Sequence, residues 1–314
     1  MSLVASVIVP GTTANLGPGF DCLGAALSLY NQFSFTLRDE PKAPPLTIRA
    51  LGSQADQVST TPDNLVYQAF VACCRHLKQQ VPPVEITIRL GIPLARGLGS
   101  SATAIVGGLV GANLLAGSPL ATSELLELAI TLEGHPDNVV PALLGGCQLA
   151  ASQVVKGQKT WQVCEVPWHN TIIPVVAVPH FTLATAQARA VLPLEVSRAD
   201  AIFNLARLGL LLRGLDSGDR PWLAAALEDK LHQPYRQVLI PGYAAVREAA
   251  IGAGAYGAVI SGAGPTLLAL TNSVQAEAVA AAMVDAWDAA GIQAQARVLY
   301  LDRNGVRSSR EQRA

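Results

Sequence analysis

The sequence predicts an α+β protein built from two domains. Its 314 residues exceed the usual size of a single domain, so two separate cores are expected. Half of the residues are apolar and only 14% are charged, which is typical of a globular chain with an ample core. Short β-type runs and helical patterns occur in both halves of the chain, which favours two units that each mix strands with helices.

The expected elements follow from the period of the apolar residues. In the first half, alternation or short apolar runs predict strands near Val4 to Val9, Phe33 to Leu37, Leu46 to Ala50 and Val84 to Leu90. A helical period predicts helices near Asn64 to Lys78, Ser101 to Leu115 and Ser123 to Leu132. In the second half we expect strands near 172–178, 257–261, 266–270 and 296–300, and helices near 198–215, 243–253 and 276–290.

The polar stretch Ser152 to Thr160 is the expected boundary between the domains, although a hairpin turn explains it equally well. We therefore expect an N-terminal domain over residues 1–158 and a C-terminal domain over residues 159–314. The tail from Arg303 to Ala314 is polar and carries four arginines, so we expect it to be disordered.

Charge and cysteine content narrow the class of partner. The net charge of −1 provides no basic field for a nucleic acid or an anionic membrane, so small molecules are the expected partners. The chain begins without a basic leader and has no apolar run of about 18 residues, which predicts neither export nor membrane insertion. The five cysteines lack CxxC spacing, which indicates reduced thiols in a cytoplasmic protein: Cys22, Cys73, Cys74, Cys147 and Cys164.

A glycine-rich loop between a predicted strand and an apolar helix is the strongest chemical signal. Its residues are Pro93, Leu94, Ala95, Arg96, Gly97, Leu98, Gly99, Ser100, Ser101, Ala102 and Thr103. Glycines let backbone N–H groups approach phosphate oxygens, and the helix N-terminus adds partial positive charge. No lysine follows the second glycine, so this is not a Walker A loop. The loop predicts a polyanion site, although a strand-to-helix turn capped by serine uses the same residue types.

Three further blocks accompany this loop, and each alone is equally well explained as a turn. They are Pro10 to Gly24, which contains Asn15 and Asp21; Glu133 to Gly146, which contains His135, Asp137 and Asn138; and Ser261 to Thr266, which contains Gly262 and Gly264. Together, in this order and with the loop PxxxGLGSSAT, they resemble the motifs of the GHMP kinases over nearly the whole chain. The first two blocks, and the segments Thr185 to Pro193 and Leu231 to Arg236, resemble the homoserine kinases in particular.

The resemblance implies a fold and an activity. We expect an N-terminal domain similar to the second domain of ribosomal protein S5, a ferredoxin-like C-terminal domain and a site at their junction. The expected reaction moves the γ-phosphoryl group of ATP, with Mg²⁺, to the side-chain hydroxyl of L-homoserine. A homodimer is expected on the same ground.

The resemblance also implies roles for particular residues. Residues 93–103 and Asn64 are expected to bind ATP, and Ser100 and Glu127 to hold Mg²⁺. Glu127 is preferred to Glu133 because it stands ten residues before Asp137, and six helical residues turn the direction by about 240°. The expected catalytic residues are Asn15, Asp21, Ser100 and Glu127. The expected substrate-binding residues are Asn15, Asp21, His135, Asp137, Asn138, Thr185, Arg189, Arg236, Gly262 and Gly264.

Several alternatives stay open at this point. Arg189 and Arg236 could clamp the carboxylate of an amino acid as planar forks, but a carboxylated alcohol such as mevalonate, or another isoprenoid precursor, could use arginines too. Asp21 could act as a general base or could only orient the hydroxyl, because a loose phosphoryl-transfer transition state has little need of a base. A ligand sensor without catalytic activity is also compatible with the fold.

Overall fold

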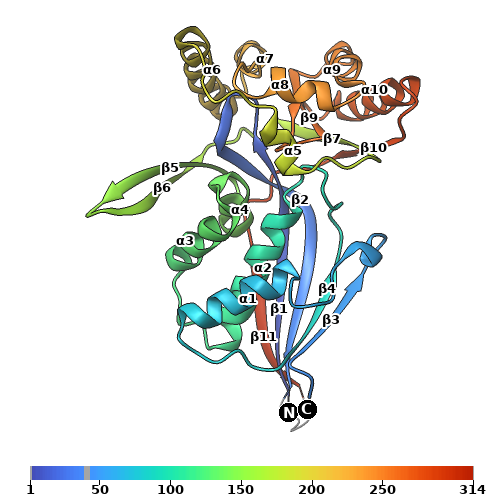
Figure 1. Ribbon diagram of the computed structural model, residues 1–314. Helices are drawn as coiled ribbons and strands as arrows, with labels where there is room; N and C mark the ends of the chain where they lie inside the picture. Colours follow the sequence, from blue (N-terminus) through green and yellow to red (C-terminus); the bar gives the residue numbers. More distant parts are fainter. Residues whose placement is uncertain (1, 39–42, 314) are drawn as a thin grey trace.

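Two β-sheets with helices around them make up the chain, which the computed structural model describes over residues 2–38 and 43–313 (Figure 1). The mixture of strands and helices in two units confirms the α+β prediction. The first sheet has seven strands in the order β11-β1-β2-β4-β3, with β5 paired to β2 and β6 paired to β5. Their bounds are β1 Ser2–Asn15, β2 Gly19–Leu37, β3 Leu46–Leu51, β4 Val84–Arg89, β5 Cys147–Val155, β6 Gln158–Val166 and β11 Arg307–Arg313.

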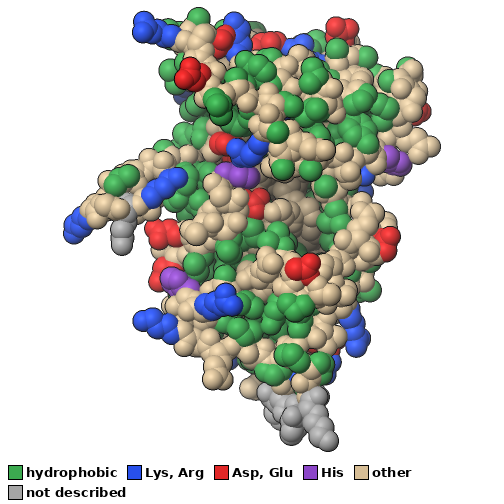
Figure 2. Space-filling model, in the orientation of Figure 1, with side chains coloured by type: hydrophobic (Ala, Val, Ile, Leu, Met, Phe, Trp, Pro, Cys, Tyr) green, Lys and Arg blue, Asp and Glu red, His purple; other side chains and the backbone are tan. Residues whose placement is uncertain are grey.

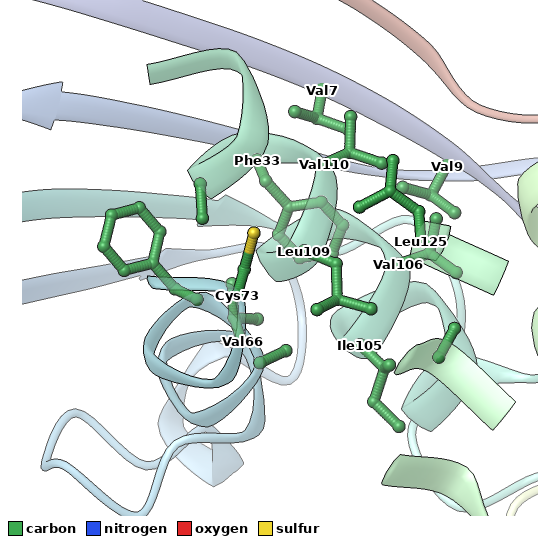
Figure 3. Close-up of a cluster of buried hydrophobic side chains, with 14 of the residues drawn as sticks. Val7, Val9, Phe33, Val66, Cys73, Ile105, Val106, Leu109, Val110 and Leu125 are labelled. Carbon is green, nitrogen blue, oxygen red and sulfur yellow. The ribbon is translucent and has the colours of Figure 1, made fainter. Parts of the chain in front are cut away.

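Four helices cover one side of this sheet: α1 Leu65–His76, α2 Ser100–Leu115, α3 Thr122–Glu133 and α4 Pro136–Leu144. Figure 3 shows how the core forms between them, with Val7 and Phe33 of the strands facing Val106 and Leu109 of α2. α2 is buried almost all round because its glycines permit close approach. A Cβ at Gly108 would lie 2.2 Å from the carbonyl oxygen of Val66 in α1. The buried α2 thus holds the preceding glycine-rich loop in place.

The second sheet has four antiparallel strands in the order β10-β7-β9-β8, the arrangement of a ferredoxin-like domain. Its strands are β7 Ile173–Pro179, β8 Gly257–Ile260, β9 Leu267–Thr271 and β10 Ala294–Val298. Its helices are α5 Thr185–Ala190, α6 Arg198–Ser217, α7 Arg220–Ala226, α8 Gln233–Arg236, α9 Tyr243–Gly252 and α10 Ala276–Ala289. Short 3₁₀ turns occupy Ala55–Gln57 and Gln237–Leu239. No helix among the described residues is long and apolar enough to cross a membrane.

The polar stretch 152–160 is a hairpin turn, which is one of the two interpretations that the sequence allowed. β5 pairs antiparallel with β6, with Val155 opposite Gln158, and the two strands extend away from the body of the molecule (Figure 1). Both strands belong to the first sheet, so the chain enters the second sheet only at Ile173. The division between residues 158 and 159 therefore falls inside this hairpin.

The prediction of a disordered tail was wrong for residues 307–313. These residues form β11, which pairs with β1 in antiparallel register from Ile8 opposite Arg307 to Ser2 opposite Arg313. The edge of β1 offers backbone N–H and C=O groups that a polar segment can satisfy as well as an apolar one. Polar composition therefore could not predict this strand, because its stability comes from the sheet edge that it covers.

Candidate functional site

A cavity of about 660 Å³ lies between the two units, where Figure 2 shows the molecule hollowed between its upper and lower parts. Its lining combines three kinds of residue. Apolar side chains come from the first sheet, from α1 and α2 and from the segment before α1. The glycine-rich loop lies beside them. The third part of the lining is a cluster of polar side chains that come from both domains. The cavity is thus lined by residues that lie up to 249 positions apart, from Asn15 to Gly264.

Backbone geometry in the glycine-rich loop suits an anion site. Gly97 and Gly99 have φ values of +76° and +68°, in the left-handed region that favours glycine. Gly99 is the N-cap of the buried helix α2, and it makes no side-chain cap bond to the first N–H groups. A Cβ at Gly97 would lie 2.2 Å from the carbonyl oxygen of Ser261, so the third sequence block packs directly on the loop.

The residues expected to bind ATP divide into two groups. Those that line the cavity are Asn64, Leu94, Ala95, Arg96, Gly97, Gly99, Ser100 and Ser101. Pro93, Leu98, Ala102 and Thr103 lie outside the lining. The side chains of Leu98 and Ala102 are buried in the apolar cores of the protein, so they do not reach the cavity. Within this motif, several side chains build the loop and do not face the cavity.

Arg96 has a structural part in the loop. Its Nε donates to the Pro179 carbonyl at 3.0 Å and its Nη2 to the His180 carbonyl at 2.6 Å. Its Nη1 donates to Leu94 of the loop itself. Because Pro179 ends β7, this guanidinium ties the glycine-rich loop of the first domain to the sheet of the second.

The structure does not place Glu127, the carboxylate expected to hold Mg²⁺, at the cavity. Glu127 is exposed and does not line the cavity, whereas Glu133 does line it and accepts a 2.7 Å hydrogen bond from Ser101 Oγ. The two glutamates differ because they lie on different sides of helix α3. Leu125, Ala129 and Ile130 form its buried side, and Glu133 follows Ala129 by four residues, so it continues that side toward α2.

Charges around Glu133 are close and partly buried. Burial is the main cause that raises the pKa of the Glu133 carboxyl, while the Ser101 hydrogen bond and His135 act in the opposite direction. Burial alone would lower the pKa of His135, but its hydrogen bond with Asp137 and the charges of Asp137 and Glu133 outweigh burial and raise it. His135 Nδ1 donates to Asp137 Oδ1 at 2.6 Å.

Asn138 extends this group into the first sheet. Its Nδ2 donates to Asp137 Oδ1 at 3.3 Å, and its Oδ1 accepts from Thr12 Oγ1 of β1 at 2.8 Å. Asp137 and Asn138 are buried in the first turn of α4. The three polar residues of this sequence block are therefore brought together at the cavity, as their motif predicts.

An ion pair joins the two domains across the polar part of the cavity. Arg189 of α5 donates from Nη1 to Asp21 Oδ2 at 3.0 Å and from Nη2 to Asp21 Oδ1 at 2.8 Å. The hydrogen bond with Asp21 is the main cause that raises the pKa of Arg189. Asn15 accepts from the Asp21 N–H and donates to the Gly262 carbonyl, which fixes the loop that carries the carboxylate. The fork of Arg189 thus faces an internal carboxylate in this structure.

Arg236 is the second arginine of the polar part, and it is almost wholly buried. Its Nε donates to the Ala188 carbonyl at 3.0 Å and its Nη1 to the Gly262 carbonyl at 3.1 Å, so two of its three nitrogens hold backbone. The guanidinium also lies over the Phe20 ring, 5.1 Å from its centroid. Burial lowers the pKa of Arg236 from its ordinary value.

Asn64 and Asn31 support the remaining part of the cavity. Asn64 caps α1, accepting from the N–H groups of Val66 and Tyr67. Asn31 accepts from the N–H groups of Gly91 and Ile92. The apolar side chains around them are Phe33, Val58, Leu65, Val66, Ile88, Leu90 and Ile105.

Sequence reasoning missed or set aside several of these residues. The spacing to Asp137 favours Glu127 over Glu133, whereas the apolar stripe of the helix favours Glu133. Asn31 and the apolar lining carry no local signal, because they belong to strands and helices that look like ordinary core. All ten of the expected substrate-binding residues line the cavity.

Comparisons with known proteins agree with this geometry. A family model described as the GHMP kinases N terminal domain matches residues 64–146, and one described as GHMP kinases C terminal matches residues 211–289. A homoserine kinase of Trichormus variabilis is 62% identical over 308 residues, covering 98% of this chain and 100% of the relative. One of Nostoc punctiforme is 61% identical over 310 residues, with the same coverage of both chains.

A solved structure gives the same result at lower identity. The crystal structure of homoserine kinase from Cytophaga hutchinsonii superposes with a TM-score of 0.87 and 29% identity, covering 98% of this chain and 97% of that chain. The superposition thus covers nearly the whole of both chains, and with it both domains. The chain belongs to the GHMP kinases and, among them, to the homoserine kinase family.

Proposed function

We propose that this protein transfers the γ-phosphoryl group of ATP to the side-chain hydroxyl of L-homoserine, giving O-phospho-L-homoserine and ADP. The observation that carries the proposal is a set of opposite charges beside an anion-binding loop. Asp21, Arg189 and Arg236 lie in the same cavity as Gly97 to Ser101. A zwitterionic amino acid would find a carboxylate for its ammonium and guanidinium groups for its carboxylate.

The ion pair between Asp21 and Arg189 supports an amino acid over a simple hydroxy acid. An amino acid can replace the pair by giving its ammonium to Asp21 and its carboxylate to Arg189. A hydroxy acid such as mevalonate has no ammonium, so it would take Arg189 and leave Asp21 half-buried without its partner. An unpaired, partly desolvated carboxylate costs free energy, which would favour the zwitterion.

ATP would place its base among the apolar side chains near Asn64 and its phosphates at the backbone of Gly97 to Ser101. For Mg²⁺, Ser101 and Glu133 fit as one hydroxyl and one carboxylate, because their oxygens already lie 2.7 Å apart at the start of α2. When bound, Mg²⁺ would neutralise charge on the β- and γ-phosphates. Ser100 lines the same place and could assist through its hydroxyl.

The protein's own contribution to catalysis would chiefly be to position the substrate for phosphoryl transfer. Both oxygens of Asp21 accept bonds from Arg189, which suits an orienting group better than a proton acceptor. His135, Asp137 and Asn138 would hold the remaining polar atoms of the substrate near the phosphate loop. We therefore propose catalysis without a dedicated base, which a loose transition state allows.

We also propose that the protein works in the cytoplasm, since all five cysteines are free thiols.

A substrate panel tests the proposal directly. Purified protein with ATP and Mg²⁺ should release ADP and form a phosphate monoester with L-homoserine. It should do so at least about 100-fold less efficiently with mevalonate or 4-hydroxybutyrate, because these lack the ammonium. Equal efficiency with mevalonate would refute the amino-acid assignment. Calorimetric binding of ATP and homoserine without any ADP release would instead identify a sensor without catalytic activity.

A further inference from the structure

The ring of Phe20 lies where side chains of the second domain meet the start of β2 in the first. Its centroid is 5.1 Å from the guanidinium carbon of Arg236 and 5.9 Å from that of Arg189. His232 stacks on the same ring, with the two ring planes 20° apart. Phe20 is partly buried and does not line the cavity. Any effect of this ring on a ligand therefore passes through the side chains that it supports.

The two guanidinium groups beside the ring repel each other. Burial is the main cause that lowers the pKa of Arg236, and the charge of Arg189 lowers it further. Arg189 has Asp21 as its counter-ion, at 2.8 Å. Arg236 donates to two backbone carbonyls and forms no ion pair with any described residue. The uncharged rings of His232 and Phe20 lie beside it instead, so aromatic rings accompany this buried charge.

An aromatic ring suits this place better than a carboxylate would. Its face attracts a cation, and the attraction is strongest where water is partly excluded. The ring attracts the charge of the guanidinium group and uses none of its N–H donors. Arg236 keeps its Nη2 without a hydrogen-bond partner among the described residues, since Nε and Nη1 are taken by carbonyls. A carboxylate at the position of Phe20 would bind that nitrogen and compete with a ligand.

We propose that Phe20 is a positioning residue for the carboxylate of the amino-acid substrate, because its ring holds the guanidinium groups of Arg189 and Arg236 side by side. The inference rests on the proposed function, in which these two arginines bind that carboxylate. Phe20 directly precedes Asp21, so one short segment supplies both the partner of the ammonium group and the support of the arginines. None of these ring contacts involves the glycine-rich loop, so the ring should act on the amino acid and not on ATP.

Removing the ring while keeping an apolar side chain tests this role. Phe20→Leu should raise KM for L-homoserine about tenfold, roughly the value of two cation–π contacts, and change KM for ATP less than about twofold. The sharper readout is the ratio of kcat/KM for L-homoserine to kcat/KM for L-homoserine amide, whose neutral carboxamide replaces the carboxylate. Phe20→Leu should lower this ratio about tenfold, because the arginines lose the support that aligns them. A merely structural loss would lower both efficiencies alike.

Two controls separate the ring from other effects. Phe20→Tyr keeps the aromatic face and should keep the ratio within about twofold of the wild type. Phe203 of α6 is a matched site, because its ring also lies beside two cations, 4.4 Å from Arg207 and 4.6 Å from Lys230. It too is partly buried and outside the lining of the cavity. Phe203→Leu should leave the ratio and both KM values unchanged.

The possible outcomes separate this inference from the proposed function. A wild type that phosphorylates L-homoserine, together with a Phe20→Leu variant that keeps the wild-type ratio, overturns the inference alone. So does a Phe20→Tyr variant that loses the ratio as fully as Phe20→Leu, or a wild type with no preference for the carboxylate. A wild type that phosphorylates neither compound overturns the proposed function, and this inference with it. If Phe20→Leu does not fold, Phe20→Met also removes the ring and is judged by the same ratio.

Discussion

Glu133 and Glu127 show how much a single residue depends on the direction in which its helix faces. The two carboxylates are six positions apart on α3, yet one accepts a hydrogen bond from Ser101 in the cavity and the other faces solvent. Their chemistry is identical in isolation. Packing of α3 against α2 and α4 distinguishes them, so paired substitutions at these two sites are informative.

The first prediction concerns metal-dependent activity. Glu133→Gln should lower kcat by on the order of 10²-fold, because an amide would remove the charge with which Glu133 is proposed to hold Mg²⁺ at the transferring phosphoryl group. Glu127→Gln should stay within about twofold of the wild type, as exposed substitutions usually do. Initial rates measured over a range of Mg²⁺ concentrations check both. Equal losses in the two variants would contradict the assignment of Glu133.

The second prediction concerns stability against pH. The pKa of Glu133 is raised in the folded protein, mainly by burial, so the folded state holds this proton more tightly than the unfolded chain. Its contribution to stability is therefore greatest below the ordinary glutamate pKa and is lost as pH rises through the raised value. The Glu133→Gln variant has no ionisable group at this position, so its stability does not fall in this way as the pH rises.

Thermal melts should consequently show Glu133→Gln to be more stable than the wild type near pH 7.5. The two melting temperatures should converge near pH 4, where the wild-type carboxyl is protonated. Glu127→Gln serves as the control, with no comparable gain expected at pH 7.5. A Glu133→Gln variant that melts below the wild type at neutral pH would show that the ionised carboxylate stabilises the fold.

His232 is a buried residue that we expect to position Arg236. Its Nε2 donates to the Gly17 carbonyl at 2.8 Å, and its Nδ1 faces Arg236 Nη1 at 3.5 Å. Its ring stacks on Phe20, with the ring centroids 5.1 Å apart. Burial lowers the pKa of His232, which keeps the ring neutral and able to accept from the guanidinium. The Asp229 carboxylate accepts from the His232 N–H and fixes the start of α8.

The third prediction follows from this arrangement. His232→Asn should raise KM for homoserine about tenfold or more while KM for ATP changes less than about twofold, since Arg236 is proposed to serve the amino-acid side of the site. His76→Asn on the exposed end of α1 is the control, and it should leave both constants unchanged. Equal increases in both KM values would indicate a general loss of structure instead of lost positioning.

At the scale of elements, the glycine-rich loop depends on two neighbours that are remote in sequence. α2 holds its C-terminal end through close packing on α1, and the Ser261 carbonyl occupies the space where Gly97 lacks a side chain. Ser261 Oγ also donates to the Gly97 carbonyl at 2.6 Å. The shape of the glycine-rich loop is therefore set jointly by the first and second domains.

The fourth prediction tests this close approach. Gly97→Ala should destabilise the fold by about 2–4 kcal/mol and raise KM for ATP, because its Cβ would clash with a backbone oxygen and would also require a positive φ. Gly134→Ala shares the positive φ but meets nothing within 4 Å, so it should cost only about 1 kcal/mol. Urea titrations of both variants, with ATP kinetics, measure the difference. Equal costs would mean that the backbone angle matters and the contact does not.

At the scale of the whole molecule, the chain returns to its own beginning. After building the second sheet it crosses back, and β11 completes the first sheet beside β1. Arg310 of β11 also donates to the Leu114 carbonyl at the end of α2. The two domains are consequently not separable at one point in the sequence, since the first domain contains both ends of the described chain.

The fifth prediction follows from that return. A chain ending at Val306 should lose several degrees of melting temperature and aggregate on storage, because the edge of β1 would be exposed as an open pairing site. A chain lacking only Ala314 is the control and should behave as the wild type. Calorimetry and light scattering report the two effects. Wild-type stability in the shorter chain would show β11 to be dispensable.

The sequence by itself determined the fold class, the order of most elements and the identity of the polar residues that line the cavity. It could do so because apolar period, glycine-rich turns and ordered motifs are local properties that one stretch of chain carries. Asn15, Asp21 and Arg189 were expected from the resemblance of their motifs to the homoserine kinases, and each lines the cavity.

Only the tertiary structure decided which carboxylate of α3 faces the cavity, that the polar tail closes a sheet and that Arg189 is held by Asp21. Each of these depends on a partner that is distant in the sequence: α2 for Glu133, β1 for the tail, and a loop 168 positions away for Arg189. The local sequence determines which residues are able to make such contacts. Packing of the two domains determines which contacts form, because the free energy gained by burying surface exists only once the chain has folded.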